Sequence, residues 1–118
     1  NQQRYIFDLV TECENINFDI DKVNTLLHLV KNINTTISYS YQREQWRVTL
    51  LHIACMHSNI KMVKILIEHG ADVTIGDQRL GWHPYLFTSN KEIHKYLKSH
   101  LQSHGVGYQN VTLNCYIL

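Results

Sequence analysis

One segment near the middle of the chain, residues 59–69, has the periodicity of an amphipathic helix. Its apolar positions recur at helical spacing, and lysine and glutamate side chains fill the opposite face. The segment ends at His69 and Gly70, and a glycine at this point can take the left-handed conformation that closes a helix. A shorter apolar segment, residues 50–55, precedes it. The sequence therefore predicts a pair of helices that pack against each other.

The same pattern occurs twice more in the chain. Residues 21–32 form a second amphipathic segment with the apolar residues 5–10 before it, and residues 92–101 form a third with residues 83–88 before it. Only a few residues separate the two parts of the third pair, so its leading helix must be short. We expect three similar helix pairs within a single domain that covers residues 1–118.

The first two pairs are further apart than the last two, and the extra residues lie around positions 35–43. There Ile37, Tyr39 and Tyr41 alternate with serines, which is the period of two that is typical of an extended strand. The sequence predicts an extended loop or a small hairpin at this place.

Composition limits what the chain can bind. It has 118 residues, 44% of them hydrophobic, and a formal net charge of +1. A charge this small gives no strong attraction to nucleic acid or to an anionic membrane, and no apolar run is long enough to span a bilayer. We expect a partner that is recognised by shape, and no membrane insertion.

The cysteines indicate a reducing compartment. Cys13, Cys55 and Cys115 are odd in number and form no C-x-x-C pair, which argues against a disulfide framework and against a zinc knuckle. We expect an intracellular protein, cytoplasmic, nuclear or both, that is a monomer or part of a larger chain or complex. The absence of an initiator methionine suggests an excised fragment.

Residues 49–54, with the sequence TLLHIA, resemble the T-P-L-H-x-A motif of the ankyrin repeat. The resemblance continues through residues 62–74 and is clearest over residues 49–77. It implies an all-α stack of about three degenerate helix-turn-helix repeats, with an extended loop insertion near residues 34–47 and a short C-terminal extended segment. The repeats would cover residues 4–36, 44–76 and 77–104, with a tail at 105–118.

The chain departs from the motif at two places. Leu50 stands where the family has proline, although the next repeat keeps Pro84, and Arg47 stands where the family has glycine. The second departure puts the usual tight turn in doubt. The residues that would carry the structural motif are Thr49, His52, Ala54, Gly70 and Pro84.

His52 lies within an apolar run and could be a ligand, a catalyst or a structural residue. In the family the threonine and histidine of the motif bind each other and the neighbouring backbone, so the resemblance implies that Thr49 and His52 do so here. A buried imidazole needs a partner for each nitrogen, which this arrangement supplies. We favour the structural role, and we interpret Cys55 as a core residue.

The resemblance also implies that the chain is a protein–protein interaction module, such as an adaptor, scaffold or inhibitor, with no catalytic site, cofactor or metal. It would bind through its loop tips and the concave face of its first helices. Trp46 and Trp82 are the preferred anchors, because tryptophan is enriched among residues that dominate binding energy. The alternative is that each tryptophan packs onto its own loop or onto residues 38–41. The full set implied for partner binding is Gln45, Trp46, Val48, Met56, His57, His69, Gln78, Arg79 and Trp82.

An alternative function uses the histidine- and lysine-rich residues 91–104. His100 and His104 would share a helix face, and His94 or Cys115 could complete a metal site. The same stretch could bind RNA through its lysines and Tyr96, although a solvated helix face explains those lysines as well and makes nucleic acid an unlikely partner. No phosphate-binding loop and no Ser-His-Asp constellation is present in the sequence.

The last residues, 111–118, alternate apolar with polar side chains after the turn Gly105–Gly107. This pattern predicts a strand. It would either cover the open end of the stack or offer an edge for pairing with another chain.

Overall fold

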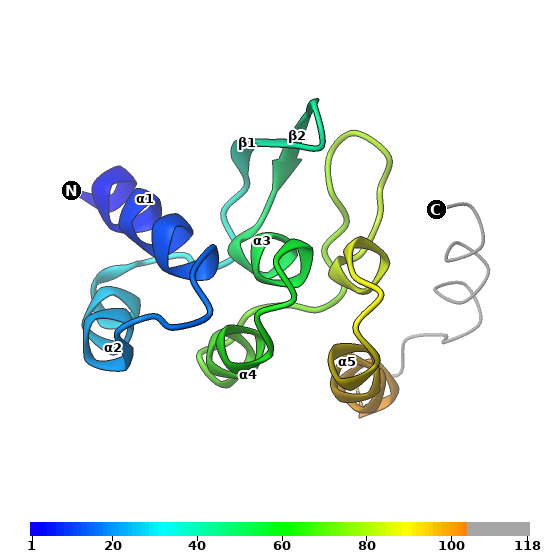
Figure 1. The fold of residues 1–118 in the computed structure, drawn as a ribbon. Coiled ribbons are helices and arrows are strands. Elements are labelled where there is room, and N and C mark those ends of the chain that lie inside the picture. Colours follow the sequence, from blue (N-terminus) through cyan, green and yellow to red (C-terminus); the bar gives the residue numbers. More distant parts are fainter. Residues whose placement is uncertain (104–118) are drawn as a thin grey trace.

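The computed structural model describes residues 1–103, in which helix pairs stand side by side (Figure 1). One row holds α1, α3 and the short 3-10 helix η1, and a second row below it holds α2, α4 and α5. Helix α3 packs against α1, α4 and η1, so it lies at the centre of the described fold. The helices are α1 (Gln2–Cys13), α2 (Ile20–Leu29), α3 (Leu50–Met56), α4 (Ile60–Glu68), η1 (Pro84–Phe87) and α5 (Lys91–Ser103).

The six helices overlap the six apolar segments in which the sequence predicts them. The third leading helix is η1, a single 3-10 turn that begins at Pro84. It is short because α5 already starts at Lys91 and leaves no room for further turns. The predicted repeat boundaries, 4–36, 44–76 and 77–104, and the single domain stay predictions.

The fold is not helical throughout, because a β-hairpin is present where the sequence predicts an extended loop or a small hairpin. Strands β1 (Ile37–Tyr41) and β2 (Glu44–Val48) pair antiparallel and project above the first row of helices (Figure 1). The turn between them consists of Gln42 and Arg43, both with positive φ, which is the conformation that matches the twist of a two-residue hairpin. The predicted extended insertion is thus a small sheet.

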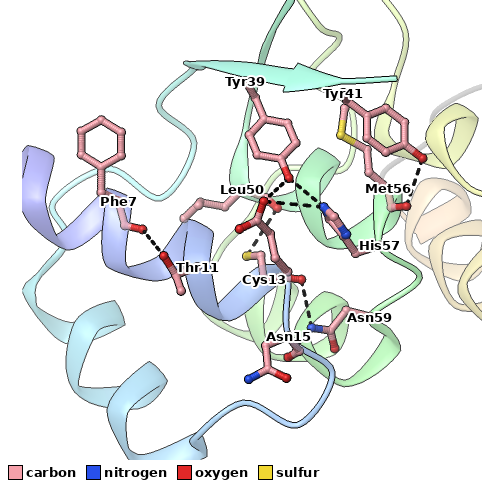
Figure 2. Close-up of polar contacts among 11 residues, drawn as sticks. Phe7, Thr11, Cys13, Asn15, Tyr39, Tyr41, Leu50, Met56, His57 and Asn59 are labelled. Atoms are coloured by element: carbon pink, nitrogen blue, oxygen red, sulfur yellow. Dashed lines mark hydrogen bonds and ion pairs between the residues drawn. The ribbon is translucent and has the colours of Figure 1, made fainter. Parts of the chain in front are cut away.

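Asn59 joins the first helix pair to the second. Its Oδ1 accepts a hydrogen bond from the backbone N–H of Met62, which caps α4. Its Nδ2 donates to the carbonyl of Cys13 at 3.1 Å and to that of Asn15 at 3.2 Å (Figure 2). Because Asn59 is buried, these bonds replace water that the three backbone groups would otherwise need.

The core runs through all three helix pairs. Fully buried side chains come from α1, α2, α3, α4 and α5 and form one hydrophobic cluster with the end of β2. Cys13 and Cys55 belong to this cluster as free thiols, and burial raises the pKa of both. None of the helices in residues 1–103 is long and apolar enough to cross a bilayer. The predicted C-terminal strand and the tail 105–118 lie outside the described residues.

Candidate functional site

Thr49 and His52 form a hydrogen-bonded pair at the start of α3. The backbone N–H and the hydroxyl of Thr49 both donate to Nδ1 of His52, at 3.2 and 2.9 Å. Nε2 then carries the proton and donates to the carbonyl of Trp82 at 2.8 Å. Burial lowers the pKa of His52 to about 4, although the Trp82 carbonyl opposes this shift. The ring is therefore neutral at pH 7, and both of its nitrogens already have partners.

The loop that receives this bond is organised by Asp77, whose side chain is almost fully buried. Its carboxylate accepts from the backbone N–H groups of Arg79 and Leu80, each at 2.8 Å, and of Trp82 at 2.7 Å. Gly76 lies so close to the same loop that a Cβ there would stand 2.6 Å from the carbonyl oxygen of Gly81. These contacts place Trp82 beside the hairpin.

Three aromatic rings from different elements meet next to this loop. Trp46 of β2 and Trp82 lie 6.1 Å apart, and Phe87 of η1 lies 5.0 Å from Trp46 and 5.9 Å from Trp82, measured between ring centroids. The indole N–H of Trp46 donates to the carbonyl of Tyr41 at 3.3 Å. The guanidinium of Arg79 lies 4.9 Å from the Trp46 ring centroid and pairs with Glu44 at 2.9 Å. Both tryptophans are thus held in place by their neighbours.

A groove opens beside these rings, between the hairpin, the end of α3 and η1. We call it the aromatic groove. No charged side chain lines it, and its lining includes hydroxyl and amide groups as well as aromatic rings. Its lining consists of Tyr41, Gln42, Trp46, Met56, Ser58, Trp82, Leu86, Phe87, Thr88 and Ser89.

A second polar cluster holds the hairpin against the end of α1 and α3 (Figure 2). The hydroxyl of Tyr39 donates to the carboxylate of Glu14 and lies 2.7 Å from Nε2 of His57. Tyr41 donates to the carbonyl of Met56 at 3.2 Å. Partial burial and the Glu14 carboxylate raise the pKa of Tyr39, so its hydroxyl stays protonated at neutral pH. The cluster fixes the face of the hairpin that borders the groove.

Apart from Val48, the residues implied for partner binding divide into three groups. Trp46, Met56 and Trp82 line the aromatic groove, and His57 lies beside it, with its ring 6.2 Å from that of Tyr41. Arg79 supports Trp46 from the loop. The third group lies away from the groove.

That third group comprises Gln45, His69 and Gln78. Gln45 belongs to the opposite face of the hairpin, where its side chain binds Ser40. His69 follows α4 in the second row and binds the carbonyl of Ile65. Gln78 is exposed and donates its backbone N–H to the carbonyl of Arg47 at 3.0 Å.

Val48 needs a correction. Its side chain is 0% exposed, so it cannot contact a partner. The resemblance assigned it a surface position by counting from the motif, but the last residue of β2 turns its side chain into the core beneath the hairpin. The sequence did not predict that Tyr41 and Phe87 line the groove, because the two residues are far apart in the chain and meet only in the folded protein. The alternation of tyrosine and serine in β1 was the available signal for Tyr41.

The metal and RNA alternatives stay predictions, because part of the segment they use lies outside the described residues. Within residues 1–103 no three histidine, cysteine, aspartate or glutamate side chains are grouped so that they could hold a metal ion. Nε2 of His94 faces the carbonyls of Tyr85 and Thr88, and the Tyr96 ring has Lys64 5.6 Å from its centroid. His104 and Cys115 lie outside the described part of the chain.

Taken together, the helices form a stack of helix pairs from which the hairpin projects, and an uncharged groove opens beside the hairpin. Residues 47–78, the part of the chain that contains α3 and α4, match the ankyrin repeat family. Repeats of this family generally mediate protein–protein interaction and are generally not catalytic. No curated protein matches the chain.

Proposed function

We propose that this chain is a protein-recognition module that binds a partner protein in the aromatic groove. The observation that carries the proposal is the meeting of Trp46, Trp82 and Phe87 from a strand, a loop and a 3-10 helix around one uncharged hollow. Aromatic side chains and methionine are enriched at the centres of protein interfaces, where charged residues are depleted. The groove has this composition, since Met56 also lines it.

The groove is held in its shape before a partner arrives. Trp46 is bonded to Tyr41 and covered by Arg79, and Trp82 is held through its backbone by Asp77 and His52. Binding to a preformed surface costs less conformational entropy than binding to a mobile loop. This supports recognition of an apolar side chain that enters the groove between hairpin and η1.

The module would work as an adaptor, a scaffold or an inhibitor inside the cell. The proposal of a cytoplasmic or nuclear location rests on the cysteine pattern, in which Cys13 and Cys55 are buried free thiols. The partner would supply the apolar side chain that enters the groove, and the chain would bind it without catalysing a reaction.

The test is affinity capture from cell extract with the wild-type chain and two arginine variants. Ser89→Arg places a long charged side chain at an exposed position of the groove, whereas Ser99→Arg makes the same change at an exposed position of α5 away from it. A specific partner is expected to be lost by about tenfold or more with Ser89→Arg and retained with Ser99→Arg. Equal capture by both variants would refute the groove, provided circular dichroism shows both to be folded.

A further inference from the structure

The hairpin has two outer edges, and they differ in whether the rest of the protein bonds to them. In the register of the sheet Tyr41 faces Glu44 across the two-residue turn, so Ile37, Tyr39 and Tyr41 direct their backbone groups toward β2. The alternate residues direct theirs outward. On β2 the outward carbonyl of Arg47 accepts a bond from the N–H of Gln78.

On β1 the outward residues are Ser38 and Ser40. Within residues 1–103 their backbone N–H and C=O groups make no hydrogen bond to another part of the chain. Both residues are exposed. Proteins usually block such an edge with lysine, proline or a bulge, and β1, with the sequence ISYSY, has none of these. The edge is therefore free to pair with another strand.

A hollow of about 480 Å³ lies directly beside this edge, between α1 and the segment that leads into β1. Its wall is largely apolar and includes Phe7, which is 56% exposed although it is a large aromatic side chain. Ser38 and Arg47 of the hairpin form the opposite wall. A strand added to β1 would have an apolar surface within reach of its side chains.

The charged side chains that line this hollow are all positive. Lys31 and Arg47 line it, and no carboxylate does. In the described part of the chain neither cation forms an ion pair, and the guanidinium of Arg47 donates only to the hydroxyl of Ser38 at 3.3 Å. Electrostatic complementarity therefore favours an acidic segment over a basic one.

We propose that an extended acidic segment of a partner protein adds a strand to β1, with its backbone paired to Ser38 and Ser40 and its carboxylates near Lys31 and Arg47. An apolar side chain of the same segment packs against Phe7. The inference rests on the proposed role in protein recognition and adds to it a second surface, on the side of the hairpin opposite the loop of Gln78. Strand addition supplies affinity through main-chain bonds, and the side chains select the partner.

The probe is the peptide fluorescein-Glu-Val-Glu-Leu-Glu-Val-amide, labelled at its N-terminus and titrated with the wild-type chain by fluorescence polarisation. Three control peptides accompany it. Two carry backbone N-methyl groups, one on each set of alternate residues, and the third has lysine in place of glutamate. Saturable binding is expected for the parent peptide. At least one N-methylated peptide, and the lysine peptide, are expected to bind about tenfold more weakly, since each loses pairing groups or charge attraction.

Two proline variants form a matched pair on the protein side. Ser40→Pro removes an outward N–H of β1, and Gln45→Pro removes the outward N–H of the residue that faces it on β2. Neither change removes a backbone bond between the two strands, and both remove the same side-chain bond, from Gln45 to the hydroxyl of Ser40. Ser40→Pro is expected to lower the affinity for the parent peptide about tenfold. Gln45→Pro is expected to leave that affinity within about twofold of the wild-type value. If Ser40→Pro fails to fold, the N-methylated peptides still decide the question with the wild-type chain.

Three results of the peptide titrations would overturn the inference. These are no saturable binding of the parent peptide, equal binding of the parent and both N-methylated peptides, or equal effects of the two proline variants. Concentration-dependent dimerisation that Ser40→Pro abolishes would also overturn it, because a second copy would then occupy the edge. The proposed function fails separately, since its test uses Ser89→Arg and a captured protein, whereas this one uses a peptide and the edge of β1.

Discussion

Acidification is expected to destabilise the protein through one side chain, His52. Its ring is buried and neutral, with a pKa of about 4 in the folded chain against 6.5 for an ordinary histidine. Because the pKa is lower in the folded state, the unfolded chain binds more protons between these two values. The stabilising contribution is therefore complete above about pH 6.5, is lost as the pH falls toward 4, and changes no further below that.

The size of the effect follows from the two pKa values. At about pH 5 an unfolded histidine is almost fully protonated, whereas about nine-tenths of the folded His52 is still neutral. The difference in proton binding, summed from about pH 7.5 down to about pH 5, amounts to about 2 kcal/mol of unfolding free energy. This pH range lies above the ordinary pKa values of aspartate and glutamate, so carboxylates contribute less to it.

The assay is urea unfolding followed by circular dichroism at both pH values, for the wild-type chain and for His52→Gln. Glutamine does not titrate, so subtracting the variant removes the contribution of the other histidines. The wild type should lose about 2 kcal/mol more than the variant on acidification. A difference near zero, or an imidazole resonance of His52 that titrates near 6.5 in the NMR spectrum, would refute the assignment of a buried neutral ring bonded to Trp82.

Two further substitutions, each with a control, test contacts between segments of the fold by urea unfolding. Asn59→Ala removes the cap of α4 and the two bonds to the first helix pair, and should cost about 2 to 3 kcal/mol, whereas Asn90→Ala removes only the cap of α5 and should cost about 1 kcal/mol. Equal losses would mean that the bonds between the pairs contribute nothing. Gly76→Ala should cost more than the roughly 1 kcal/mol expected of Gly70→Ala, because the new methyl group would meet the Gly81 carbonyl, while Gly70, with φ of 96°, has open space around it. A larger loss of stability for Gly70→Ala than for Gly76→Ala would show that the loop after Gly76 moves easily to accept the methyl group.

The helices could be predicted from the sequence because the information that forms them is local. The apolar spacing of α4 and the His69–Gly70 end determine that helix within a dozen residues. The hairpin was visible in part, through the tyrosine and serine alternation of β1. Its turn was harder to identify, since Gln42 and Arg43 are not the asparagine and glycine that such turns prefer.

The site could be predicted only in part, because its residues meet through contacts between distant segments. Trp46 and Trp82 were found by counting from the motif, but their contact with Phe87 depends on how η1 packs against α3. The bonds of Tyr39 to Glu14 and His57 join α1, β1 and the end of α3, and no local sequence pattern predicts them. The same counting misplaced Val48, since it took no account of the inserted hairpin.

The two-residue turn of the hairpin also determines which changes of length the protein can accept. Side chains alternate between the two faces of a strand, so adding or deleting one residue within β2 would exchange the faces of everything that follows it. Trp46 and Val48 would then point to solvent, and Arg47 would point to the core. Substitutions at the tip are less disruptive when the new residue accepts a positive φ, because Gln42 and Arg43 are exposed. Related chains are therefore expected to vary at the tip among residues that accept a positive φ, while single-residue insertions and deletions in the strands would be removed by selection.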